Sequence, residues 1–203
     1  MTTSKHTISA AQLAELSQVK PEEIDYWVAR NEKTASWPIE LNSAISKKFC
    51  YGDALAVEIA RQINDNTGIT SGPSVLESLR IVSYSAAVPL YFEYIAGQSH
   101  LAKAMTDFWL AVSSARNSWG PGPRGNTPEL TSFGSAEYWS NMHFTGSFDQ
   151  VCLAIKQWMT KETTEYTDTD PGRVFMVDIS TADRRLRKRA GEMSIEIAGN
   201  SFV

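Results

Sequence analysis

The sequence predicts a mainly α-helical protein of the α+β class, in which helices precede a small β element near the C-terminal end. Three observations support this prediction. A serine followed three residues later by Gln or Glu, which is typical of a helix start, occurs at Ser9, Ser74 and Ser147. Apolar residues recur at helical spacing, and alternation typical of strands is confined to residues 174–197. With 203 residues the chain is long enough to bury one medium core or two small ones.

Composition excludes several classes of protein. Hydrophobic residues make up 42% and charged residues 21% of the chain, which is typical of globular proteins, and the net charge of −4 does not by itself favour a nucleic-acid partner. No apolar run approaches the ~18 residues that a membrane span needs, and Met1–His6 lacks the core of a signal peptide. Cys50 and Cys152 have neither metal-binding spacing nor a disulfide framework. We therefore expect a cytoplasmic protein with reduced thiols and no contact with membranes.

The N-terminal residues predict two helices joined by a tight turn. Ser9 and Gln12 form a capping box, so a helix should run over Ala10–Leu16. Pro21 suits the first turn of a second helix, where its missing N–H is not needed. Val19 lies in the turn, where a buried apolar residue can fix the crossing angle of the helices. The second helix carries apolar residues at helical spacing, namely Ile24, Trp27 and Val28.

A short wing and a third helix are predicted next. Trp37-Pro38 favours an extended segment, and two wing strands are placed around Pro38–Leu41 and Lys47–Cys50. Asp53 is expected to cap a helix with the buried stripe Leu55, Ile59 and Ile63, and Thr70–Pro73 is expected to form a linker. Residues 1–68 are therefore predicted to form a winged helix-turn-helix domain, and residues 69–203 a second domain.

The second domain is predicted to be α-rich and to serve dimerisation or effector binding. The expected helices run from Ser74 to about Ala87, over Leu90–Arg116, around Pro128–Asn141 and from Ser147 through Trp158, with a loop at Gly120–Gly125. Val174–Ile179 and Met193–Ile197 are predicted to form a terminal β hairpin. The aromatic residues of the Leu90–Arg116 segment either pack in the core or line a pocket for an apolar effector.

Residues 7–63 resemble the DNA-binding domain of the MerR family. The resemblance rests on Ser9–Leu16, the turn through Val19, Ile24–Trp27, and the segment Lys47-Lys48-Phe49 followed by Tyr51-Gly52-Asp53. It covers the first third of the chain. Phage excisionases and small terminase subunits share this local winged fold.

The resemblance implies a transcriptional regulator that acts as a homodimer on double-stranded DNA. In that family the second helix enters the major groove and the wing contacts phosphates. Carried onto this sequence, the DNA-binding candidates are Lys20, Glu22, Glu23, Tyr26 and Arg30 on or beside the helix, and Lys47 and Lys48 in the wing. Trp27 is assigned to the core instead.

The candidate DNA-binding helix is acidic. Asp25 occupies a position that is usually basic in the family, and Glu22 and Glu23 precede it. Residues 1–66 contain seven Lys or Arg against nine Asp or Glu, a net charge of −2. Affinity for DNA would then come from a dimer, a partner protein or basic residues elsewhere.

The basic residues that could supply this charge lie near the C-terminus, in a run of five within six positions. They form either an accessory phosphate-binding or acidic-partner patch, or a solvated basic turn or strand balanced by Asp178, Asp183 and Glu192. The candidates are Arg184, Arg185, Arg187, Lys188 and Arg189.

The sequence thus predicts a DNA-binding regulator without enzymatic activity, cofactor or metal. His6, His100 and His143 are scattered, and the catalytic motifs of hydrolases and metalloenzymes are missing from the sequence. Two alternatives stay open. One is a protein-interaction adaptor that uses the acidic helix, and the other is an excisionase or packaging factor of a phage or mobile element.

Overall fold

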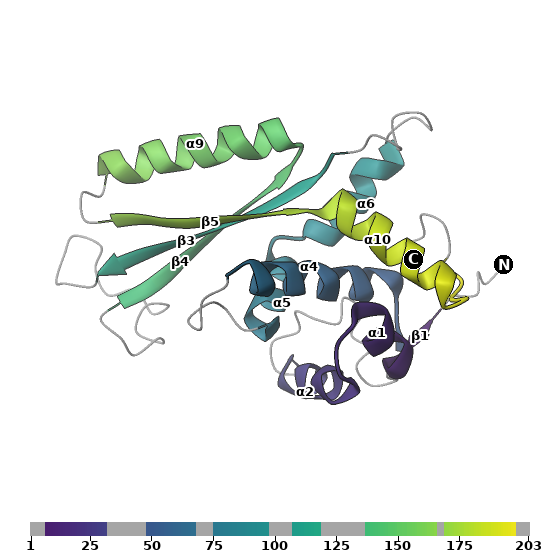
Figure 1. Cartoon of the computed structure of the whole chain (residues 1–203). Helices are drawn as coiled ribbons and strands as arrows, with labels where there is room; N and C mark the ends of the chain where they lie inside the picture. Colours follow the sequence, from purple (N-terminus) through teal and green to yellow (C-terminus); the bar gives the residue numbers. More distant parts are fainter. Residues whose placement is uncertain are drawn as a thin grey trace.

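The computed structural model describes residues 7–31, 48–67, 75–97, 107–118, 137–165 and 169–197 (Figure 1). The described part is mainly helical and contains two small antiparallel sheets, in agreement with the α-rich fold class that the sequence predicts. Its first elements are β1 (Ile8–Ser9), α1 (Ala10–Ser17), α2 (Pro21–Asn31), β2 (Lys48–Phe49), α4 (Tyr51–Thr67), α5 (Val75–Tyr84) and α6 (Ala87–Gly97). They are followed by β3 (Trp109–Ser118), β4 (Glu137–Gly146), α9 (Phe148–Glu165), β5 (Thr169–Asp178) and α10 (Ile179–Glu192).

The start of α1 is the predicted capping box. The Gln12 amide donates to Ser9 Oγ over 3.2 Å, and the Ser9 amide donates to Gln12 Oε1 over 2.9 Å. The helix ends where Gln18 adopts a left-handed conformation with φ of 55°, and the Val19 amide donates to the Ala14 carbonyl over 2.9 Å. Pro21 then opens α2, as predicted. The tight corner between the two helices follows from these local hydrogen bonds.

The short strand β2 pairs with β1 in an antiparallel ladder, with Ile8 opposite Phe49 and Ser9 opposite Lys48. The predicted partner segment, Pro38–Leu41, lies outside the described residues. The next helix begins at Tyr51, three residues earlier than an Asp53 cap requires. Asp53 instead occupies the third helical position and accepts a hydrogen bond from the Cys50 amide over 2.8 Å. The predicted buried stripe of α4 is confirmed at Leu55, Ile59 and Ile63.

The prediction of one long helix over Leu90–Arg116 is wrong. Helix α6 ends at Gly97, and Trp109–Ser118 forms β3, the central strand of the sheet with order β4-β3-β5. A continuous apolar run such as Phe108–Val112 fits a buried strand as well as a helix, so its periodicity could not distinguish the two. The aromatic side chains of this region pack against one another in the core, with 5.3 Å between the ring centres of Tyr91 and Phe92.

The helix predicted around Pro128–Asn141 is wrong over the part that the structure describes. Residues 137–141 belong to β4, which pairs with β3 and places Ser114 opposite Asn141. The third capping box is confirmed after this strand. The Ser147 amide donates to Gln150 Oε1 over 2.9 Å, and Gly146 precedes it with φ of 151°, a conformation that L side chains rarely adopt.

The predicted C-terminal β hairpin is also wrong. The strand β5 pairs with β3, and the chain then enters α10 at Asp178, whose carboxylate accepts the Thr181 amide over 2.9 Å. Residues 193–197 do not form a strand; the Ile195 amide donates to the Ala190 carbonyl over 2.9 Å. The basic run therefore lies on a helix. Its buried side has the helical spacing that the dense positive charge obscures in the sequence, with Ile179, Ala182, Leu186 and Ala190.

Figure 1 shows α9 lying along one face of the three-stranded sheet, while α4 occupies the centre of the helical part. The last helix, α10, packs against both α4 and α1. One buried core joins residues of α4, such as Leu55, to Leu79 of α5 and Leu186 of α10. Helix α10 thus packs against α1 although the two are far apart in the sequence. No helix of the described residues is long and apolar enough to cross a membrane.

Replacement of Leu55 by alanine tests this packing. Because Leu55 is fully buried in α4, we expect Leu55→Ala to lower the free energy of unfolding by about 2–5 kcal/mol. The matched control is Leu153→Ala on α9, where the leucine is 57% exposed and the loss should stay near ~0.5 kcal/mol. Urea denaturation followed by circular dichroism measures both. Equal losses from the two variants would contradict the placement of α4 at the centre of the core.

Candidate nucleic-acid interface

The helix α2 has two distinct faces. Ile24, Trp27 and Val28 are buried against the core, which confirms the assignment of Trp27 to the interior. Glu22, Glu23 and Asp25 are exposed, and so is Tyr26, whose exposed fraction is 53%. The outward face of α2 therefore carries Glu22, Glu23 and Tyr26, three of the residues that the resemblance assigns to contact with DNA.

Part of the acidity of α2 has a structural cause. The Lys20 amide, just before the helix, donates to Glu23 Oε2 over 2.8 Å. Glu22 and Glu23 both lie in the first turn, where the helix dipole favours negative charge. Glu23 is thus a capping residue, and its presence on α2 is explained without reference to a ligand.

The remaining N-terminal candidates are distributed as follows. Lys20 is exposed before α2, and Lys48 is exposed on β2 opposite Ser9. Arg30 lies in the last turn of α2, and Lys47 lies outside the described residues. Arg61 of α4, which no sequence motif singles out, donates through Nη1 to the Ser17 carbonyl over 2.5 Å. This contact holds the C-terminal end of α1 on α4, and so helps to fix the corner from which α2 emerges.

Two of the five basic residues of α10 form partly buried ion pairs, and the other three are exposed. Arg187 Nε lies 3.0 Å from both carboxylate oxygens of Asp183, and Arg189 Nη2 lies 2.6 Å from Glu58 Oε2 on α4. Both guanidinium groups are partly buried in these ion pairs. Only the other three basic residues, Arg184, Arg185 and Lys188, are exposed. The accessory patch is therefore smaller than the sequence suggests.

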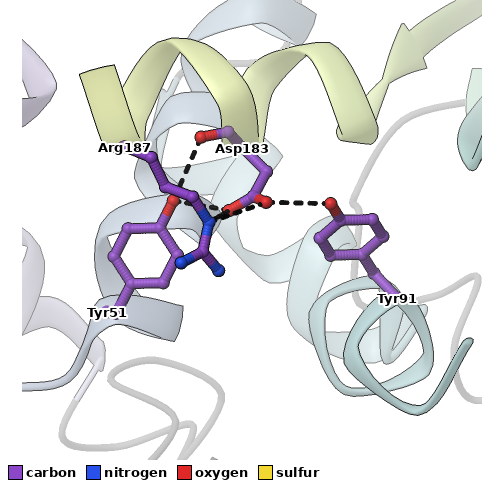
Figure 2. Close-up of polar contacts among 4 residues, drawn as sticks. All are labelled: Tyr51, Tyr91, Asp183 and Arg187. Carbon is purple, nitrogen blue, oxygen red and sulfur yellow. Dashed lines mark hydrogen bonds and ion pairs between the residues drawn. The ribbon is translucent and has the colours of Figure 1, made fainter. Parts of the chain in front are cut away.

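Asp183 is the centre of a buried polar cluster that joins three helices (Figure 2). The Tyr51 hydroxyl, from α4, donates to Asp183 Oδ1 over 2.5 Å and also contacts the Asp183 carbonyl at 3.2 Å. The Tyr91 hydroxyl, from α6, donates to Asp183 Oδ2 over 2.9 Å. Arg187 completes the cluster, with its guanidinium carbon 4.8 Å from the centre of the Tyr51 ring. Every carboxylate oxygen of Asp183 is hydrogen-bonded.

The protonation states of the cluster suit a structural role. Burial raises the pKa of Tyr51 and of Tyr91, and the negative charge of Asp183 raises it further, so both hydroxyls remain donors. Burial alone would lower the pKa of Arg187, but the Asp183 carboxylate together with Tyr51 and Tyr91 outweighs burial, and the pKa is raised overall. The cluster is thus a stable arrangement of one carboxylate and its three donors, and holds no activated nucleophile.

Neither an activated Cys50 thiol nor a metal-binding cluster occurs in the described part of the chain. Burial, assisted by the charge of Asp53, raises the pKa of the Cys50 thiol to about 12, so the reactive thiolate is disfavoured. No group of three or more His, Cys, Asp or Glu residues that could hold a metal ion occurs in the part of the chain that the structure describes.

The two helices that carry the candidate residues lie on different sides of α4 in the view of Figure 1, with α10 above α4 and α2 below it. Both are nevertheless connected through α1, which packs against α2, α4 and α10. Searches of protein-family models, of curated proteins and of solved structures find no match to this chain.

The contribution of the Asp183 cluster to the free energy of unfolding can be measured by neutralising its carboxylate. We expect Asp183→Asn to lower the free energy of unfolding by about 3 kcal/mol, because it leaves Arg187 partly buried without its counter-charge. The matched control is Glu192→Gln, which removes an exposed carboxylate 3.9 Å from Lys188 and should cost less than ~1 kcal/mol. Urea denaturation monitors both variants. A loss from Asp183→Asn no larger than that from the control would show that the cluster does not hold the three helices together.

Proposed function

We propose that this protein is a transcriptional regulator that binds double-stranded DNA as a homodimer, with α2 directed to the major groove and the β2 segment to the backbone. The observation that carries the proposal is the two-sided character of α2, which is anchored by Ile24 and Trp27 and exposes a polar face beyond a tight helical corner. The resemblance of residues 7–63 to MerR-family domains supports the same function.

The exposed side chains around α2 fit the contacts that such a complex requires. Lys20, just before α2, and Lys48, on β2, are exposed and carry positive charge, and Lys47 precedes Lys48 in the sequence. Tyr26 projects a hydroxyl that can donate to a phosphate oxygen. In a two-fold dimer, two copies of α2 would address half-sites about one helical turn of DNA apart.

Fluorescence anisotropy with labelled genomic fragments tests the proposal. We expect binding at low salt that weakens as salt rises, and an affinity reduced several-fold when Lys47→Ala and Lys48→Ala remove two phosphate contacts. Lys156→Ala, at an exposed position of α9, is the matched control and should bind like the wild type. Lack of binding at low salt, or binding that the Lys47 and Lys48 replacements leave unchanged, would overturn the proposal.

A second candidate function, that of a protein-interaction adaptor, is favoured by the acidic side chains on the exposed face of α2. Glu22 and Asp25 are exposed on this face, and Glu23 caps the helix, so the test below replaces Glu22 and Asp25 and keeps the cap. A basic protein surface would be attracted to this face, whereas DNA phosphates would be repelled.

Charge reversal separates the two functions. If α2 faces DNA, Glu22→Lys with Asp25→Lys removes a repulsion and should raise the affinity for DNA several-fold. If α2 binds a basic protein, the same variant should lose that partner in a pull-down and leave DNA binding unaltered. Thermal melting verifies that the variant stays folded, and Glu15→Lys on the exposed side of α1 is the control. Retention of the partner by the reversed variant would count against the adaptor.

A further inference from the structure

The exposed face of α10 is mainly basic and carries one acidic residue. The exposed positions of this helix are Arg184, Arg185, Lys188, Gly191 and Glu192. Positions 184 and 185 are both neighbours of position 188 on the helix surface, because residues three and four apart fall on the same side of a helix. Three positive charges are therefore gathered within about one turn, and we refer to Arg184, Arg185 and Lys188 as the α10 basic face.

The described contacts of Arg184 and Lys188 do not neutralise their positive charges. Arg184 Nη2 donates to Thr181 Oγ1 over 2.7 Å, a neutral partner that orients the guanidinium group and leaves its charge in place. Lys188 Nζ lies 3.9 Å from Glu192 Oε1, but the two side chains are 80% and 62% exposed, so this pair is weak. The strong pairs of the helix, to Asp183 and Glu58, belong to Arg187 and Arg189 instead.

The α10 basic face is rigidly attached to the helices that carry the candidate DNA-binding corner. Asp183 holds α10 to α4 and α6 through two tyrosine hydroxyls, and the Arg189–Glu58 pair adds a second link to α4. On the buried side, Leu186 is enclosed in the same core as Leu13 of α1. A ligand on this face would thus be held at a fixed position relative to α1 and α2.

We propose that the α10 basic face binds the phosphate backbone of DNA, at a stretch of DNA other than the one that α2 contacts. The inference rests on the proposed function, and it supplies the positive charge that the outward face of α2 lacks. Arginine forks match phosphate oxygens in two-point contacts. Because α2 and α10 lie on different sides of α4 in the view of Figure 1, we assign them to separate stretches of DNA.

Phosphates fit this face better than an acidic protein does. Stable protein interfaces have a core of apolar or aromatic side chains surrounded by a polar rim. None of the exposed large hydrophobic residues of the described part lies on α10. Phosphate contacts require only positive charge and hydrogen-bond donors, which are what the three side chains offer.

The salt dependence of DNA binding tests this site in the full-length chain. The probe is a labelled duplex of mixed sequence, titrated by anisotropy between about 50 and 200 mM salt. Replacing all three basic residues by Gln should make the slope of log affinity against log salt shallower by about 2–3 units, so that over this range the wild type loses about fortyfold more affinity than the variant. The single variant Arg185→Gln should change the slope by about 1 unit.

The matched control is Lys156→Gln on α9, which also removes one exposed positive charge and should leave the slope unchanged. Because the two surfaces are separate, the losses from the triple variant and from Lys48→Ala should add. Thermal melting verifies that the triple variant folds, as expected for exposed side chains.

The other possible results separate the α10 basic face from the surface around α2. A triple variant with the wild-type slope, while Lys48→Ala still weakens binding, would overturn this inference and leave the proposed function standing. A triple variant that loses binding while Lys48→Ala does not would support the α10 basic face and count against the role of β2. Lack of any DNA binding by the wild type would overturn both. If the triple variant loses binding to polyglutamate but keeps the wild-type slope on DNA, the face binds acidic protein and the inference is wrong.

Discussion

The described fold depends on how one buried carboxylate is satisfied. Asp183 lies almost fully inside the protein, where an unpaired charge would be strongly destabilising. Its compensation comes from Tyr51, Tyr91 and Arg187, which belong to three different helices. The tyrosines are 132 and 92 residues away from Asp183 in the sequence, so the cluster can form only when the last helix has docked on α4 and α6. The hydrogen bonds and the ion pair of Asp183 therefore form together with the packing of α10 on α4 and α6.

The same constraint decides which charges are left for a partner. Asp183 and Glu58 hold Arg187 and Arg189 in partly buried ion pairs, whereas Glu23 caps α2 through a neutral amide and keeps its negative charge exposed. Charge counted along the sequence consequently overstates the basicity of α10 that is available to a ligand. The charge that a ligand meets is the charge that stays exposed and unpaired by buried ion pairs in the folded protein.

The N-terminal helices are predictable because their capping interactions join residues close in the sequence. The pairing of distant strands cannot be predicted from such local patterns. The box of Ser9 and Gln12, and Pro21 at a helix start, act within a few residues, and both predictions are confirmed. The sequence predicts a helix where β3 lies, because an apolar run shows its period only once its partners β4 and β5 are known. In α10 the dense arginines obscure the buried residues between them. The site residues could be named as candidates, but the Arg189–Glu58 ion pair and the Tyr51–Asp183 hydrogen bond each join residues more than a hundred positions apart, so the sequence does not reveal them.

The position of α10 bears on what the functional unit of this protein is. Residues 1–66 carry a net charge of −2, and the outward face of α2 is acidic, so this segment alone offers little attraction to a polyanion. A group of three exposed positive charges lies instead on α10, which shares its core with α1 and α4. A truncated N-terminal segment would lose that charge, and Leu55, Ile59 and Ile63 would lose neighbours in the core. In the function that we propose, DNA binding is therefore a property of the whole chain, because the helix that reads the groove and the charge that holds the backbone come from opposite ends of the sequence.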